Sequence, residues 1–83
     1  MSVADDFESA VARVNALPAP PPQNVQLELY GLFKQAKAGD ATGKRPGMMD
    51  VRGRAKYDAW AGRRGLSPEQ AMQAYIELAK SLG

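Results

Sequence analysis

The sequence of 83 residues contains no cysteine and no histidine. Their absence removes thiolate nucleophiles, disulfide bonds, the usual zinc ligands and the side chain that most often transfers protons near neutral pH. Only carboxylates, lysines, hydroxyls and backbone groups remain for chemistry. The composition therefore disfavours an enzyme, and we expect neither catalytic residues nor a metal site.

Long apolar runs are also missing. No stretch approaches the ~20 residues of a membrane-spanning helix, and residues 1–10 are acidic, without the apolar segment of a secretion signal. We expect a cytoplasmic protein without integral membrane association. The content of 45% hydrophobic and 24% charged residues is typical of a folded chain. Because this length supports only one hydrophobic core, a single domain over residues 1–83 is expected.

Positive charge is concentrated in the middle of the chain. Residues 31–64 hold nine bases and three acids, a net charge of +6, whereas the segments before and after them are net acidic. The whole chain carries only +2. A basic segment of this kind predicts that an anion binds there.

Apolar residues recur at helical spacing in four segments, and none alternates with the period of a strand. The predicted helices are a first one ended by Pro18, a second from about Pro22 to Ala38, a third from an Asp50 N-cap to about Arg63, and a fourth starting at the capping sequence Ser67–Gln70. Gly39 is expected to close the second helix in the αL conformation. The pattern predicts an all-α four-helix domain with a long central connection over residues 39–49.

Several residues around this connection have structural explanations. Met48 and Met49 are expected to fill the gap between the second and third helices. Trp60 is expected to anchor the packing of the third helix. Gly53 costs about 1 kcal/mol relative to alanine inside a helix, so close packing is expected at that position.

Tyr30, Phe33 and Lys34 lie at the i, i+3, i+4 spacing of one helix face. They either hold an anion beside an aromatic ring, or the rings are core and Lys34 extends its ammonium group to water. Arg52 and Lys56, one turn apart, offer a similar basic edge or a solvated face. The last-helix Tyr75 is either core or a hydroxyl donor to a polar ligand.

A longer set of residues carries a resemblance. It comprises the runs Tyr30–Ala36, Gly39–Asp40, Arg45–Met48 and Gly53–Trp60, with further matches at Phe7, Ala10, Ala71, Met72 and Ala74–Ile76. This pattern resembles the acyl-CoA-binding protein family over essentially the whole chain. The resemblance implies an up-down-down-up bundle of four helices. It also implies a non-catalytic intracellular carrier and pool former for long-chain fatty acyl-CoA, with a role in fatty acid metabolism.

The resemblance also implies a set of binding residues. Tyr30, Lys34 and Lys56 match the family positions that hold the 3′-phosphate of CoA. Tyr75 matches an aromatic contact to the nucleotide, and Arg52 a position near the phosphates. Phe33 and Tyr57 match aromatic positions near the adenine and the acyl groove, and Gly31 and Leu32 lie within the same run.

The sequence departs from the family at a few of these positions. Tyr57 stands where the family usually has tryptophan, Phe33 where tyrosine is common, and Asn15 where a base is common. These departures bear on affinity and chain-length preference. Two other classes stay open on composition, namely a basic helical module that binds nucleic acid and a protein-interaction domain. The resemblance implies a monomer with an acyl-CoA ligand and no nucleic-acid partner.

Overall fold

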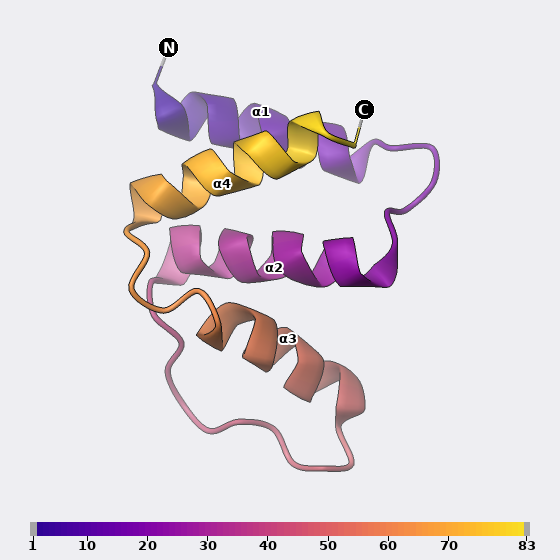
Figure 1. Cartoon of the computed structure of the whole chain (residues 1–83), viewed down its shortest axis with the longest axis vertical. Helices are drawn as coiled ribbons and strands as arrows, with labels where there is room; N and C mark the ends of the chain where they lie inside the picture. Colours follow the sequence, from indigo (N-terminus) through magenta and orange to yellow (C-terminus); the bar gives the residue numbers. More distant parts are fainter. Residues whose placement is uncertain (1, 83) are drawn as a thin grey trace.

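The computed structural model describes residues 2–82 and contains four α-helices in this part of the chain. They are α1 (Val3–Asn15), α2 (Gln23–Ala38), α3 (Val51–Ala61) and α4 (Pro68–Lys80). Helices α1 and α4 run in one direction, and α2 and α3 run in the opposite direction (Figure 1). The predicted all-α, up-down-down-up architecture is confirmed.

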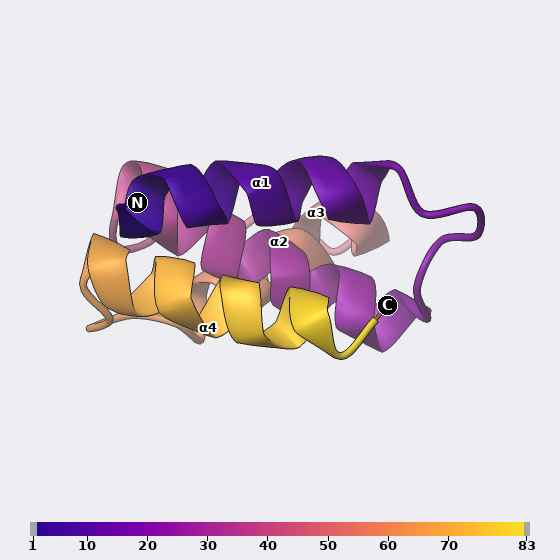
Figure 2. The ribbon, with the colours of Figure 1, turned by 90° about the horizontal axis from the view of Figure 1, so that it is seen from above.

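The helices form a flat molecule with extents of 40 × 29 × 14 Å. Helix α4 packs against both α1 and α2, whereas α3 packs against α2 alone. Figure 2 shows α1 and α4 side by side along the molecule. Because it has one neighbour, α3 contains no fully buried residue. None of the described helices is long and apolar enough to cross a membrane.

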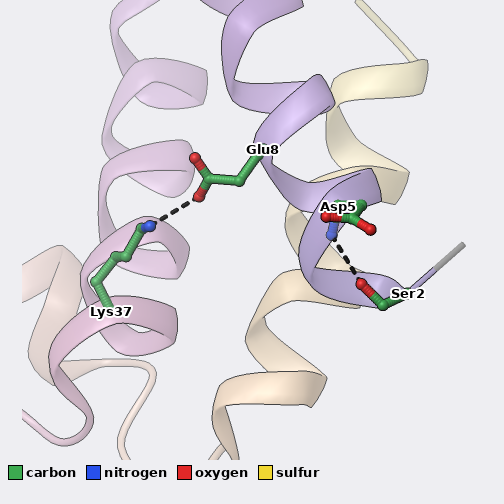
Figure 3. A network of polar contacts seen from close by, with 4 residues as sticks. All are labelled: Ser2, Asp5, Glu8 and Lys37. Atoms are coloured by element: carbon green, nitrogen blue, oxygen red, sulfur yellow. Dashed lines mark hydrogen bonds and ion pairs between the residues drawn. The ribbon is translucent and has the colours of Figure 1, made fainter.

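Aromatic side chains from three helices meet in the core. Phe7 of α1 is completely buried, with its ring centroid 5.1 Å from that of Tyr75 in an edge-to-face arrangement. The Phe7 ring also stacks against Phe33 of α2 at 6.0 Å. Glu8 and Lys37 form a 2.7 Å ion pair between α1 and α2 (Figure 3). Lys37 Nζ also lies 5.6 Å from the ring centroid of Phe7. Both charged groups are exposed, so the aromatic burial contributes far more stability than the ion pair.

Side-chain caps fix the starts of α3 and α4, as the sequence predicts. The Asp50 carboxylate accepts the Gly53 N–H at 2.9 Å. Ser67 and Gln70 form the complete capping box at the start of α4. At the start of α1, Ser2 accepts the Asp5 N–H at 3.2 Å (Figure 3). A Cβ on Gly53 would lie 2.6 Å from Asp50 Cγ, so this glycine makes room for the cap and not for a neighbouring helix.

Three expectations about α3 and the connection that precedes it are wrong. Gly39 has the expected positive φ of 80°, but its ψ of −156° lies outside the αL region and directs the chain into an extended path. Helix α3 ends at Ala61, and turns continue to Gly65 at φ 95°. Met48 and Met49 are 80% and 98% exposed and fill no gap. Both lie in a turn that the 3.0 Å bond from the Asp50 N–H to the Gly47 carbonyl closes, and this turn leaves their side chains in solvent.

Polar side chains hold this connection against the helices. The buried Gln35 amide donates to Asp40 Oδ1 at 2.8 Å and to the Leu66 carbonyl at 2.9 Å. Asp40 Oδ1 also accepts the Gly65 N–H, and this bond, followed by the one from Gln35, holds the pKa of Asp40 below its usual value. The Trp60 indole donates to the Gly39 carbonyl at 2.7 Å, which confirms Trp60 as an anchor. The end of α2 and the turns after α3 are therefore joined.

Candidate ligand-binding site

The candidate site is built on the contact between the parallel helices α2 and α3. Gly31 of α2 is buried, and a Cβ at that position would lie 2.7 Å from the carbonyl carbon of Ala59 in α3. Only glycine permits this approach of the two backbones. Side chains on either side of the contact therefore reach across to the opposite helix.

Two reciprocal cation–aromatic pairs cross this contact. Lys56 Nζ of α3 lies 5.5 Å from the ring centroid of Tyr30, and Lys34 Nζ of α2 lies 4.7 Å from that of Trp60. Each helix contributes one lysine and one ring, one turn apart. In the described part of the chain, neither lysine forms an ion pair with a carboxylate. Both ammonium groups are thus positioned by rings and keep their charge available for an anion.

A hollow of about 550 Å³ opens between the first halves of α2 and α3, and we call it the basic hollow. Its positive charge comes from Arg52 and Lys56. The complete lining is Gln23, Gln26, Leu27, Tyr30, Arg52, Ala55 and Lys56. Without a carboxylate in its wall, this hollow suits a phosphate or another anion.

A second hollow, of about 530 Å³, lies on the other side of Tyr30, and we call it the apolar hollow. Helix α1, the proline-rich link and α2 form most of it, and Tyr75 comes from α4. Its lining is Val11, Val14, Asn15, Leu17, Pro20, Pro21, Gln26, Leu29, Tyr30, Phe33 and Tyr75. Gln26 and Tyr30 belong to both hollows, so an anionic and an apolar surface adjoin at these two side chains.

The structure separates the residues that share a helix face in the sequence. Tyr30 lies at the boundary of the two hollows, and Phe33 faces Phe7 and the apolar hollow. Lys34 lines neither hollow, because its ammonium group lies over Trp60. The spacing in the sequence places all three residues on one helix face. It does not show which of them line a hollow, because that depends on the neighbouring helices.

The other residues expected in the site have distinct surroundings. Tyr75 is 4% exposed, and its burial raises the pKa of its phenol, so the hydroxyl keeps its proton at neutral pH. Tyr57 packs edge-on against Trp60 and donates to the Gly43 carbonyl at 3.1 Å. Leu32 is 3% exposed within the core. Arg52 and Lys56 line the basic hollow, whereas Tyr57 and Leu32 line neither hollow.

Sequence reasoning missed Gln26 and the prolines. Gln26 Nε2 donates to the Pro21 carbonyl at 2.7 Å, which folds the link back against the start of α2. Pro20 and Pro21 thereby become part of the apolar hollow. The sequence contained one indication of the role of Gln26, because this residue precedes Tyr30 by one helical turn and so lies on the same helix face. The path of the link carries no periodic signal.

The chain is similar to known proteins over nearly its whole length. A family model described as "Acyl CoA binding protein" matches residues 4–79. The chain belongs to this family. The acyl-CoA-binding protein homolog of Manduca sexta is 49% identical over 83 residues, with 99% of this chain and 92% of that protein covered. The acyl-CoA-binding protein of Brassica napus is 44% identical over 82 residues, and the match covers 99% of this chain and 89% of that protein.

Solved structures of acyl-CoA-binding proteins confirm the fold. Acyl-CoA-binding protein 2 of Oryza sativa superposes with a TM-score of 0.92 at 38% identity, covering 98% of this chain and 90% of that chain. The protein from Moniliophthora perniciosa superposes with a TM-score of 0.86 at 45% identity, and the match covers 94% of this chain and 76% of that chain. The resemblance found in the sequence is confirmed. The nucleic-acid-binding and protein-interaction alternatives find no support in these matches.

Proposed function

We propose that this protein binds long-chain fatty acyl-CoA thioesters and acts as their intracellular carrier and pool former. The observation that carries the proposal is the contact of the basic and apolar hollows at Gln26 and Tyr30. An acyl-CoA joins a strongly anionic nucleotide to a hydrocarbon tail, so its receptor needs both surfaces side by side. The family membership supports the same ligand class.

We assign the 3′-phosphate of CoA to Tyr30, Lys34 and Lys56. The two ammonium groups lie along one helix contact, and Tyr30 carries Lys56 over its ring. Arg52, in the wall of the basic hollow, binds a further phosphate oxygen. Each charged hydrogen bond of this kind contributes roughly 1.5–3 kcal/mol.

The aromatic residues receive the less charged parts of the ligand. Phe33 and Tyr75 line the apolar hollow, where their rings contact the base, and the Tyr75 hydroxyl serves as a donor. Tyr57 acts through Trp60, against which it packs. Gly31 and Leu32 act by position, because Gly31 sets the approach of α2 to α3 and Leu32 fixes α2 on the core.

Burial of the hydrocarbon should dominate the affinity. At ~0.8 kcal/mol per methylene, a sixteen-carbon chain offers on the order of 10 kcal/mol before the costs of association and chain ordering. Calorimetry with octanoyl-, dodecanoyl- and palmitoyl-CoA, free CoA and palmitate tests this. Affinity should rise steeply with chain length, and CoA or palmitate alone should bind far more weakly. Equal affinities for octanoyl- and palmitoyl-CoA would contradict the proposal.

The remaining functional assignments belong to the same proposal. We take residues 1–83 as a single acyl-CoA-binding domain that acts as a cytoplasmic monomer, without catalysis and without a nucleic-acid partner. Relatives matched over nearly their whole length carry the name of a binding protein, which supports a non-catalytic role. Among residues 2–82 no cluster of acidic side chains is placed to hold a metal ion.

A further inference from the structure

Three large apolar side chains project from one end of the molecule. Met48, Met49 and Val51 are 80%, 98% and 73% exposed, and we call them the methionine tip. Every other large hydrophobic residue of the described chain is at least partly buried. Single exposed apolar residues are ordinary on protein surfaces, but a group of them at one place indicates a contact with another apolar phase.

The backbone holds this tip outward. The Asp50 N–H donates to the Gly47 carbonyl at 3.0 Å and closes a turn with Met48 and Met49 at its two corners. Val51 follows as the first residue of α3. The exposure is therefore built into a hydrogen-bonded turn and a capped helix.

The surroundings of the tip are positively charged. Residues 44–56 contain five bases and a single acid, Asp50. The Asp50 carboxylate already accepts the Gly53 N–H as the cap of α3. One of the five, Arg45, is compensated by Asp58 in a two-pronged ion pair with bonds of 2.8 and 2.7 Å, whereas the other four form no ion pair within the described residues. An apolar tip with bases next to it in the sequence complements a partner that has an anionic surface over an apolar interior.

The tip also lies at the same end of the molecule as the basic hollow. Arg52 and Lys56, which line that hollow, follow the tip within two turns of α3. Helix α2 runs parallel to α3, so the first half of α2 lies at this end as well (Figure 1). A flat surface in contact with the tip would therefore lie close to the first halves of both helices, which form the basic hollow.

We propose that the methionine tip docks reversibly on the surface of anionic phospholipid bilayers, and that this contact presents the basic hollow to the membrane. The inference rests on the proposed function, because long-chain acyl-CoA is an amphiphile that enters such membranes. Methionine side chains are flexible and adapt to the disordered acyl boundary of a bilayer. Lys44 and its basic neighbours are attracted by the negative surface potential, at a strength that falls with salt.

The experiment is co-flotation of the full chain, without acyl-CoA, with vesicles of phosphatidylcholine alone or with about 30% phosphatidylserine. Binding should be at least about tenfold tighter to the anionic vesicles. The double variant Met48→Ser, Met49→Ser should bind roughly tenfold more weakly than the unchanged protein because the apolar anchor is lost. Lys44→Gln should weaken binding about fivefold through its charge.

Lys80→Gln is the matched control for charge. Lys80 lies on α4, which α2 separates from α3, so its loss should leave vesicle binding within about twofold. The docking proposal is overturned if the unchanged protein floats with neither kind of vesicle. In that case the tip would bind an acidic protein surface and not a bilayer. It is equally overturned if the double serine variant binds anionic vesicles like the unchanged protein.

Palmitoyl-CoA titrations in vesicle-free buffer separate this proposal from the carrier function. The double serine variant should retain the affinity of the unchanged protein, since Met48 and Met49 line neither hollow. Loss of vesicle docking with retained palmitoyl-CoA binding confirms a separate surface. Absence of palmitoyl-CoA binding by the unchanged protein would defeat the carrier function whatever the vesicles show.

Discussion

Gly31 of α2 lies directly against the main chain of Ala59 in α3, where an added Cβ would come within 2.7 Å of the Ala59 carbonyl carbon. The obstacle is backbone, which cannot rotate away as a flexible side chain can. This contact sets the distance between the two helices that hold Lys34, Lys56 and the basic hollow. The geometry of the candidate site therefore depends on the absence of one methyl group.

Replacement of that glycine tests this dependence. Gly31→Ala should push α3 from α2 and lower the free energy of unfolding by roughly 2 kcal/mol, as overpacking does. Urea unfolding followed by Trp60 fluorescence measures the loss, and palmitoyl-CoA affinity should fall with it. Gly47→Ala is the matched control, because nothing lies within 4 Å of its added Cβ, and it should change stability by less than about 0.5 kcal/mol. Equal stabilities of the two variants would contradict the role of the close contact.

The two lysines at the helix contact should act on binding and not on folding. Lys34→Ala and Lys56→Ala should each weaken palmitoyl-CoA binding by roughly 1.5–3 kcal/mol, with the unfolding midpoint almost unchanged. Lys80→Ala, on α4, serves as the control with unchanged affinity. Calorimetry on each variant and on the double variant measures the effect. Ordinary affinity in the double variant would remove the phosphate site proposed here.

Asp40 should make the fold sensitive to acid. Its pKa is lowered chiefly by the Gly65 N–H and then by Gln35, from an ordinary value of 3.8. A lowered folded-state pKa stabilises the fold fully above the unfolded value, and this contribution is lost as the pH falls through the folded value. Asp40→Asn should therefore be less stable than the unchanged protein at pH 6. The difference should shrink below about pH 3.8 in urea titrations. A difference that stays constant from pH 6 to pH 2.5 would rule out this linkage.

The sequence predicted those parts of the fold that local chemistry determines. The caps at Asp50 and Ser67 were readable because a side chain placed before an apolar repeat has one favourable use there. The order and direction of the helices came from the family resemblance, which spans the chain. The fully buried Phe7 also followed from its helical spacing.

The parts that depend on distant contacts were not predictable. Met48 and Met49 were expected to be covered, but the turn closed between Gly47 and Asp50 leaves them exposed, and helical spacing does not reveal such a turn. Gln26 became a boundary of the two hollows only because the proline link folds back to accept its amide hydrogen. Lys34 lies over Trp60, a partner 26 positions later in the chain. Local periodicity carries no information about such pairs.

The attachment of α3 to a single neighbour has a consequence for motion. A helix without fully buried residues is the segment that detaches first, so its amide hydrogens should exchange with solvent sooner than those of α4. Since α3 supplies one wall of the basic hollow, each such opening also takes the hollow apart. A ligand bound in the hollow would therefore hold α3 against α2, and the ligand-bound protein would be more rigid than the ligand-free protein.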